Sequence, residues 1–316
     1  TKLTLIPYNE NYTDRHPFDM PYSCLREIVA KMDTANILDP LQWDGTHPLI
    51  VKVPYNVYLA LTKLCETDDF GCSDDKKKGS QWKALQKFLH CPRRQVKDEV
   101  HVLEQYRWSK TDGFRGRLFS GGSTGLNRHL RANILSTTDD LDQCASAQTI
   151  IAYVCRLCGV PCPVVDEYVR DREGVLARIM QEEGWNRGTA KDEAIFVFMR
   201  DTMQSRTPTL RRLDEEAKRI QRQLSQVPAL RWVLDAAKAS KDSNQLGSFL
   251  SRTYQVIENK LTLAVAFEIG VSPQCLIFDG LAIDKGSNHA AVLKAAEEVC
   301  ERLCPGIGMK GAFKAY

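Results

Sequence analysis

The chain has 316 residues, of which 43% are hydrophobic and 26% charged, and its formal net charge is +3. These values are typical of a globular protein with one lobed domain or two subdomains. No apolar run approaches the length of a membrane span and the chain does not open on a signal peptide, so we expect an intracellular protein with no membrane partner. The small net charge neither requires nor excludes a nucleic-acid ligand.

Eleven cysteines are scattered through helix-like and strand-like segments. The only tight cluster is Cys155, Cys158 and Cys162, and no second pair with zinc-ribbon spacing follows it. Cys155 and Cys158 also fall in an apolar helical run, where buried thiols are common. We therefore expect reduced, structural cysteines, and a metal bound at these three positions stays open as an alternative.

The first third of the chain alternates short periodic segments with polar ones. Periodicity predicts helices over 25–32, 55–64 and 81–89 and a strand over 48–53. The Asp/Lys-rich segment 67–79 has few apolar residues and predicts a flexible loop. We expect residues 1–112 to form an N-terminal accessory region.

Glycines and arginines then become dense over residues 113–131. Glycine allows a backbone to approach a ligand closely, and the planar guanidinium of arginine offers a fork of donors that suits phosphate. The candidate nucleic-acid contacts are Arg115, Arg117, Asn127, Arg128 and Arg131. A basic turn before a solvated helix explains the same residues without a ligand.

Carboxylates stand at the edge of two strand-like runs, Asp140 and Asp142 in the first and Asp279 in the second. A carboxylate held at a strand edge points its oxygens outward, and two such strands side by side could hold Mg²⁺. Two metal ions bridged by carboxylates suit in-line phosphoryl or nucleotidyl transfer. Unrelated surface acids at two strand ends remain the alternative from spacing alone.

Several helices are expected between the two acidic runs, over 145–158 and 169–182 and, after a turn and cap at 184–186, from residue 187 onward. Arg187 and Lys191 lie one turn apart in the last of these, on a face that could grip phosphates. Ile195 and Met199 follow at the same spacing and could support a base. Alternatively, these are surface cations on an amphipathic helix whose apolar side includes Phe196 and Phe198.

Further helices are predicted over 213–224, 246–269 and 289–304, with a closing strand over 306–313. The order is therefore strand, several helices, strand, helix, strand. This order favours an α+β fold with a helical insertion over a doubly wound sheet.

Four segments in this order resemble the polymerase domain of family A DNA polymerases, most closely the divergent relatives in viral, virophage and mobile-element replication proteins. The resemblance covers residues 113–316 and rests on short motifs: Gly116-Arg117-Leu118 with Leu126-Asn127, Asp140-Leu141-Asp142-Gln143, the pair Arg187 and Lys191, and Phe278-Asp279-Gly280. Tyr254 and Glu258 fall where that group has a charged helix. The resemblance implies a right-hand architecture, with an antiparallel palm sheet, a helical fingers insertion over about 160–240, and a reduced, thumb-like region over 1–112.

The resemblance also implies roles for single residues. Asp140 and Asp279 would be the ligands of Mg²⁺ or Mn²⁺, with Asp142 as a third acidic group. Arg187 and Lys191 would contact the triphosphate of a nucleotide whose site includes Ile195 and Met199. Arg117 would contact the nucleic-acid backbone. The implied activity is primer extension without proofreading, and the implied partners are primer-template nucleic acid, nucleoside triphosphates and other replication proteins.

This chain departs from the cellular family A pattern at four positions. Ala145 stands where those enzymes have a glutamate that helps to exclude ribonucleotides, Ile195 where they have an aromatic residue, Met199 where they have a tyrosine, and Gly280 where they have an acid. RNA synthesis or mixed nucleotide use therefore stays open.

The departures favour an alternative from another class, a catalytically degenerate palm that serves as a nucleic-acid-binding subunit of a replication or other nucleic-acid complex. A third interpretation, a metal-dependent nuclease, predicts a histidine or lysine general base near the acids. None of the six histidines is adjacent to either acidic motif in the sequence.

Overall fold

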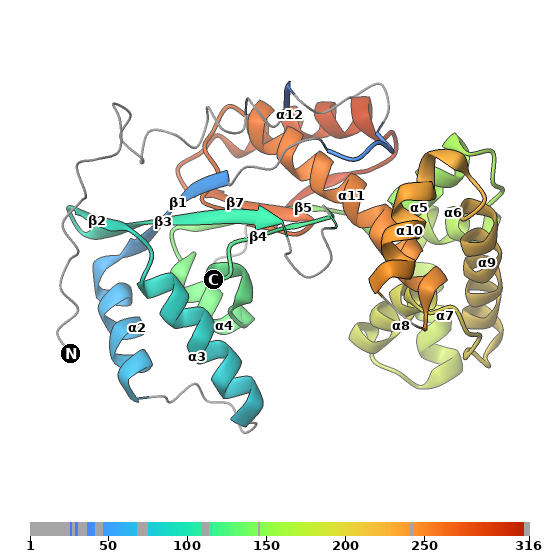
Figure 1. Cartoon of the computed structure of the whole chain (residues 1–316), viewed down its shortest axis with the longest axis horizontal. Coiled ribbons are helices and arrows are strands. Elements are labelled where there is room, and N and C mark those ends of the chain that lie inside the picture. Colours follow the sequence, from blue (N-terminus) through green and yellow to red (C-terminus); the bar gives the residue numbers. More distant parts are fainter. Residues whose placement is uncertain are drawn as a thin grey trace.

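Two antiparallel sheets and a lobe of helices make up the computed structural model of the chain (Figure 1). The structure describes residues 26, 29–30, 37–41, 47–67, 75–108, 114, 116–144, 146–240 and 243–312. The fold class is α+β, as the order of the predicted elements indicates.

The N-terminal sheet has the strand order β1-β3-β2, and the short strand β4 pairs with β3. Its strands are β1 (His47–Pro54), β2 (Arg93–Val96), β3 (Glu99–Trp108) and β4 (Leu118–Phe119). Helices α2 (Tyr55–Thr67) and α3 (Asp75–Leu89) lie on the same side of this sheet (Figure 1). Alternating apolar residues explain the packing, since Leu49, Val51 and Val53 of β1 are fully buried.

The predicted strand 48–53 and the predicted helices 55–64 and 81–89 are confirmed. The flexible loop predicted over 67–79 is wrong for residues 75–79, because α3 begins at Asp75. Aspartate suits the first turn of a helix and lysine is a good helix former, so a polar segment with these residues can be helical. Most of the predicted helix 25–32 lies outside the described residues.

The C-terminal sheet has the order β6-β7-β5-β8 and is antiparallel throughout. Its strands are β5 (Thr138–Gln143), β6 (Cys275–Ile277), β7 (Gly280–Asp284) and β8 (Met309–Ala312). The turn η2 (Ser123–Gly125) and helix α4 (Arg128–Ile134) lead into β5. The segment around Asp279, expected as one strand, is a hairpin of β6 and β7.

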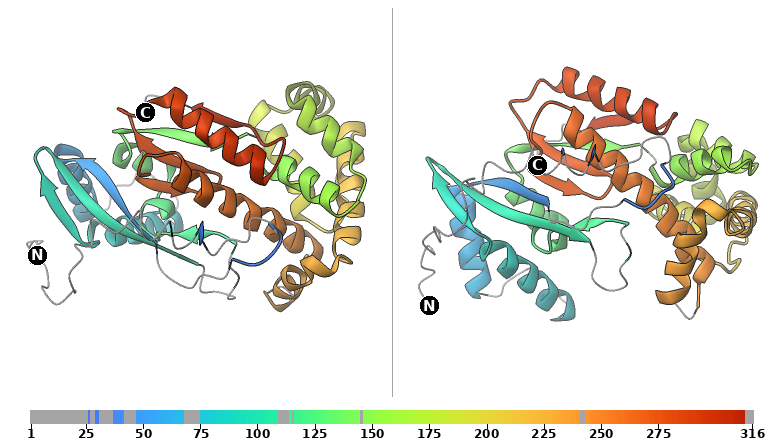
Figure 2. Two further views of the ribbon diagram at one scale, coloured as in Figure 1. Left: turned by 90° about the horizontal axis from the view of Figure 1, so that it is seen from above. Right: turned by 45° about the horizontal axis from the view of Figure 1, so that its top comes forward.

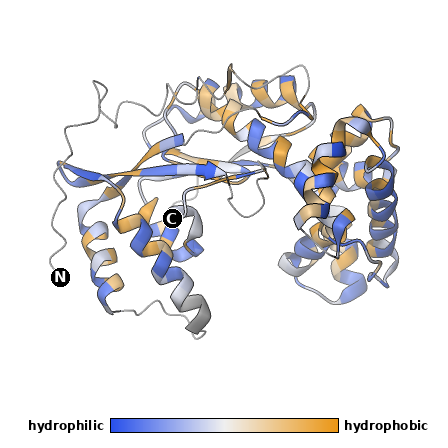
Figure 3. Ribbon diagram, in the orientation of Figure 1, coloured by the Kyte–Doolittle hydropathy of each residue, from blue (hydrophilic) through white to orange (hydrophobic). Residues whose placement is uncertain are grey.

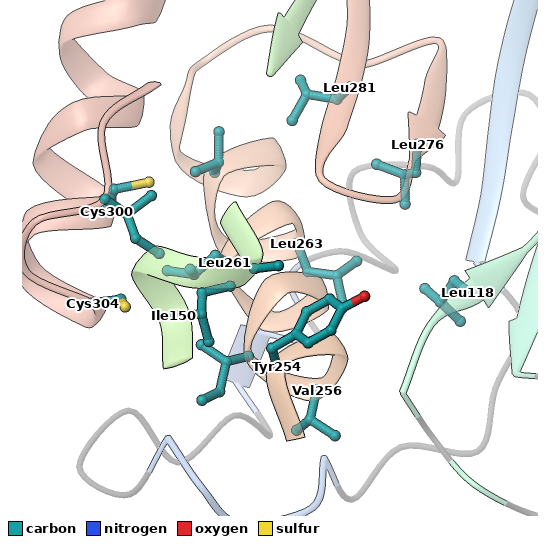
Figure 4. Close-up of a cluster of buried hydrophobic side chains, with 14 of the residues drawn as sticks. Leu118, Ile150, Tyr254, Val256, Leu261, Leu263, Leu276, Leu281, Cys300 and Cys304 are labelled. Atoms are coloured by element: carbon teal, nitrogen blue, oxygen red, sulfur yellow. The ribbon is translucent and has the colours of Figure 1, made fainter. Parts of the chain in front are cut away.

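Helices α11 (Gln245–Glu268) and α12 (His289–Leu303) lie together over one face of the C-terminal sheet (Figures 1 and 2). Helix α5 (Ser146–Leu157) packs against α11. Figure 4 shows Ile150 of α5, Leu261 of α11 and Cys300 of α12 gathered in one buried cluster beneath the sheet residue Leu281. This core fixes β5 and the β6–β7 hairpin on a rigid base.

The helical lobe lies between β5 and β6 in sequence and contains α6 (Pro163–Arg170), α7 (Arg172–Glu183), α8 (Arg187–Met199), α9 (Pro208–Leu224), η3 (Pro228–Leu230) and α10 (Arg231–Ser240). Figure 3 shows hydrophilic residues along the outer side of α9, whose Leu213, Ala217 and Leu224 are buried. The helix predicted over 169–182 is divided, because the Asp171 side chain accepts a hydrogen bond from the Gly174 amide and starts α7. The predicted turn and cap at 184–186 are confirmed, with Gly184 at φ +68°.

None of the helices in the described part of the chain is long and apolar enough to cross a membrane.

Candidate functional site

Three carboxylates, Asp140 and Asp142 on β5 and Asp279 in the β6–β7 turn, form what we call the acidic edge. Asp140 and Asp142 alternate with Leu141 along β5, so both face the same side of the sheet. In the β5–β7 ladder, Asp142 is opposite Gly280 and Asp140 is opposite Ala282. The Gln143 amide donates to the Asp279 carbonyl oxygen at 2.9 Å. Asp142 therefore lies beside the turn that carries Asp279, while Asp140 lies two residues further along the strand.

The other face of β5 is turned toward the covering helices. Leu141 is fully buried, and the Asp139 carboxylate lies 2.9 Å from His289 Nε2 at the start of α12. The side-chain Nε2 of Gln143 donates a hydrogen bond to Oγ1 of Thr262, on α11, at 3.0 Å. These contacts fix the alternation of the strand and thereby direct Asp140 and Asp142 away from the helices.

The β6–β7 turn has a left-handed residue, Phe278, and a glycine, Gly280, beside Asp142. Phe278 has φ +54°, in the left-handed region, and its carbonyl oxygen accepts a hydrogen bond from Thr262 Oγ1 at 3.1 Å. A Cβ atom at position 280 would lie 2.1 Å from Oδ1 of Asp142. A side chain at position 280 would therefore displace the Asp142 carboxylate from its present place beside the turn.

A buried ion pair supports the acidic edge. Arg117 Nε donates to Glu258 Oε2 at 2.8 Å, and Ser146 Oγ donates to Glu258 Oε1 at 2.8 Å. The Arg117 guanidinium also lies over the rings of Phe278, at 4.8 Å, and Tyr254, at 5.9 Å. This cluster joins the segment before β4, helix α11, helix α5 and the acidic turn.

Burial and the charges of Arg117 and Asp279 all affect the pKa of Glu258. Its burial raises the pKa of the carboxyl, the Arg117 guanidinium lowers it, and the negative charge of Asp279 raises it. Asp279 therefore lies close enough to interact electrostatically with the pair. Sequence reasoning placed Glu258 only in a charged helix. The sequence did contain a signal for this residue, because Glu258 stands in the apolar stretch of α11. A buried carboxylate there needs an oppositely charged partner from elsewhere in the chain.

The candidate phosphate-binding residues lie on α8, in the helical lobe. Asn186 starts this helix by accepting a hydrogen bond from the Thr189 amide. Arg187 donates through Nε and Nη2 to the two carboxylate oxygens of Glu173 on α7, at 2.9 and 2.6 Å. Lys191 is half-buried one turn further along.

Ile195 and Met199 continue the same face of α8 and are also half-buried. The buried side of α8 consists of Ala190, Ala194, Val197 and Phe198. Phe196, which the alternative interpretation put on the apolar side, is 48% exposed. The face that carries Arg187, Lys191, Ile195 and Met199 is thus the border between the buried and exposed sides.

The remaining predicted nucleic-acid contacts are dispersed. Arg115 lies outside the described residues. Asn127 caps α4, because its side-chain oxygen accepts a hydrogen bond from the Leu130 amide at 3.0 Å. Arg128 is exposed, and Arg131 Nη1 donates to the Leu126 carbonyl at 3.5 Å. Of the candidate contacts that the structure describes, only Arg117 lies in the cluster that supports the acidic edge.

Across the described ranges, no group of three or more His, Cys, Asp or Glu side chains is arranged to bind a metal. Cys155, Cys158 and Cys162 are free thiols. Mg²⁺ commonly uses only one or two protein carboxylates, with waters and substrate phosphates as its other ligands. Asp142 lies beside the turn that carries Asp279, and a carboxylate from either residue could serve as a ligand of that kind.

Comparison with protein families, with curated proteins and with solved structures found no match to this chain.

Proposed function

We propose that this protein is a template-directed nucleotidyltransferase, a DNA polymerase that extends a primer without proofreading and uses Mg²⁺ or Mn²⁺. The observation that carries the proposal is the approach of Asp142 on β5 to the Asp279 turn, which Gly280 permits. In the proposed right-hand architecture, the C-terminal sheet is the palm, the helical lobe the fingers, and residues 1–112 a thumb-like region.

The carboxylates of Asp142 and Asp279, with Asp140 beside them, would hold the metal ions. A bound metal would stabilise the charge that develops during in-line attack on the α-phosphate. The chain contributes rigidity: hydrogen bonds from Gln143 and Thr262 fix the strand and the turn against α11. Fixed carboxylates need no reorganisation when the reaction occurs.

Arg187 and Lys191 would neutralise the triphosphate, with Ile195 and Met199 supporting the base. Their position on the border face of α8 supports this assignment, since a buried side anchors the helix while the two cations remain accessible. Arg117 would act through its contacts with Phe278 and Glu258, which support the acidic turn.

A catalytically degenerate palm that binds nucleic acid is the second candidate. Two observations favour it: Arg117 and Arg187 are both in ion pairs with carboxylates, and no three His, Cys, Asp or Glu side chains of the described residues converge on a metal site. Primer-template would then bind without extension.

The test is primer extension with a labelled primer-template, in Mg²⁺ or Mn²⁺, with deoxynucleotides and ribonucleotides in parallel. Asp279→Ala is expected to abolish extension and to leave duplex binding within about twofold of the wild type. Asp235→Ala removes an exposed carboxylate that pairs with Arg231 on α10, and serves as the matched control.

Extension by the wild type and the control, lost in Asp279→Ala, would establish the polymerase, and the preferred nucleotide would settle the sugar preference that Ala145 leaves open. No extension by the wild type, with tight duplex binding, would favour the degenerate palm. Near-normal extension by Asp279→Ala would refute the assignment of the acidic edge.

A further inference from the structure

A cavity of about 350 Å³ opens beside Arg117, between the segment around residues 114–119, the end of α8 and the first half of α11. Its volume is at the lower end of the range for ligand pockets, about 300–1,000 Å³. The residues that line it are Phe114, Gly116, Arg117, Phe119, Met199, Asn244, Ser248, Ser251, Arg252 and Gln255.

The charge of the lining is positive. Among the described residues that form the cavity, two are arginines and none is a carboxylate. Glu258, which pairs with Arg117, is not part of the wall. An anionic ligand would therefore meet no like charge in the lining itself.

Arg252 is held in a defined orientation. Its guanidinium carbon lies 4.5 Å from the centroid of the Phe114 ring, and its Nη2 donates to Ser240 Oγ at 2.7 Å. Its Nε donates to Ser248 Oγ at 3.3 Å. A guanidinium fixed in this way loses little conformational freedom when it binds a phosphate or stacks on a base.

The rest of the lining combines apolar and hydrogen-bonding groups. Phe119, held edge-on against Phe278 at 5.8 Å, and Met199 provide apolar surface. Ser248, Ser251 and Gln255 are spaced three and four residues apart and so follow one face of α11. Aromatic surface, amide and hydroxyl groups, and arginine are the combination that binds a nucleobase together with its phosphate.

We propose that this cavity binds one nucleotide unit, with its base against Phe119 and Met199 and its phosphate near Arg252. The inference rests on the proposed function and extends the proposed nucleotide site, with which the cavity shares Met199, toward Arg117 and Arg252. The nucleotide could belong to an unpaired single strand or to a free nucleoside triphosphate.

Two variants test the cavity. Arg252→Gln removes the charge and keeps a hydrogen-bonding side chain, and Ser251→Leu fills the space without changing the charge. Arg231→Gln removes an exposed arginine of α10 that pairs with Asp235, and is the matched control. Fluorescence anisotropy would measure the binding of a short labelled single strand and, separately, of a labelled deoxynucleoside triphosphate. Melting temperatures would be measured for every variant.

Both cavity variants are expected to raise Kd about tenfold for one of the two probes, because Arg252→Gln removes the charge that faces the phosphate and Ser251→Leu occupies space that the nucleotide needs. The control is expected to stay within about twofold. The affected probe identifies the source of the nucleotide. If Ser251→Leu lowers the melting temperature, its effect on Kd could come from destabilisation, and the test then rests on Arg252→Gln.

Wild-type affinity for both probes in Arg252→Gln would overturn the inference, as would failure of the wild type to bind either probe. The two proposals are separable. Probe binding that depends on Arg252 in a protein without extension activity would refute the polymerase and retain the cavity. Normal extension together with probe binding that does not depend on Arg252 would support the polymerase and refute the nucleotide site in the cavity.

Discussion

Asp142 and Asp140 share one face of β5, but only Asp142 is opposite Gly280 and beside the turn that carries Asp279. Sequence reasoning assigned the metal to Asp140 and Asp279 and gave Asp142 a supporting role. The ladder register favours Asp142 as the closer partner of Asp279, because a two-residue displacement moves a side chain about 7 Å along a strand.

The first prediction distinguishes the two aspartates. Asp142→Asn is expected to lower kcat for primer extension by about 100-fold or more, since it would remove a charged ligand of the proposed metal site. Asp140→Asn is expected to lower kcat by a smaller factor. Steady-state extension assays would compare them, and a larger loss in Asp140→Asn would restore the assignment made from the sequence.

A second prediction concerns Glu173, which holds Arg187 through two hydrogen bonds on the surface of the helical lobe. In the proposed function, a triphosphate would compete with this carboxylate for the guanidinium of Arg187. Glu173→Gln is therefore expected to lower KM for the nucleotide about two- to fivefold, a modest effect because the pair is exposed. Glu215→Gln, which breaks the exposed pair with Arg211, is the control. An unchanged or higher KM in Glu173→Gln would show that the pair does not compete with the substrate.

At the scale of elements, the β6–β7 hairpin pairs with β5, with Gly280 directly opposite Asp142. A methyl group there would collide with the Asp142 carboxylate, whereas a Cβ at Gly286, in the turn after β7, would have no heavy atom within 4 Å. The two glycines thus provide a matched pair for testing the turn.

The third prediction is that Gly280→Ala reduces primer extension because the added methyl group displaces the Asp142 carboxylate. It is expected to lower the free energy of unfolding by only about 1 kcal/mol, because the clashing carboxylate oxygen can rotate away. Gly286→Ala is expected to change the free energy of unfolding by less than about 0.5 kcal/mol. Urea titrations would measure both. Equal stability and activity in the two variants would mean that Asp142 does not depend on Gly280.

At the scale of the whole molecule, a buried polar network joins the two sheets. The carboxylate of Glu104, on β3, accepts hydrogen bonds from the amide and the hydroxyl of Ser123. The Tyr106 hydroxyl, also on β3, lies 3.0 Å from Cys275 Sγ and accepts from the Leu276 amide on β6. The N-terminal region is thereby attached to the C-terminal sheet.

The fourth prediction uses the pKa of Glu104, which complete burial raises. A carboxyl with a raised pKa binds more protons in the folded state than in the unfolded state. Stability should therefore fall as pH rises above the ordinary glutamate pKa of about 4.3, with a slope of up to about 1.4 kcal/mol per pH unit. The fall should end once the pH exceeds the pKa of the folded state.

Glu104→Gln is expected to remove this contribution. Urea titrations of both proteins at a series of pH values from about 5 to about 8 would measure the difference in slope. Parallel pH profiles for the wild type and the variant would show that Glu104 has the same proton affinity in both states.

Local patterns in the sequence were sufficient for much of the fold. Helical periodicity predicted α5, α8, α11 and α12, the Gly184 and Asn186 signals predicted where α7 ends and α8 begins, and the order of elements predicted an α+β class. These features depend on residues within a few positions of one another. The hairpin of β2 and β3 was not predicted. Strand β2 is four residues long and polar, but Val100, Val102 and Tyr106 of the ten-residue β3 are buried at alternating positions, a period-2 signal that indicates a strand.

The candidate site depended on tertiary structure to a greater degree. Sequence alone determined that acids stand at Asp140, Asp142 and Asp279 and cations at Arg117 and Arg187. Only the fold decided that Asp142 lies beside the Asp279 turn, that Arg117 pairs with Glu258 across 141 residues, and that Arg187 pairs with Glu173 on the preceding helix. The physical reason is that strand register and ion pairing between elements are set by packing against a shared core, which no local pattern encodes.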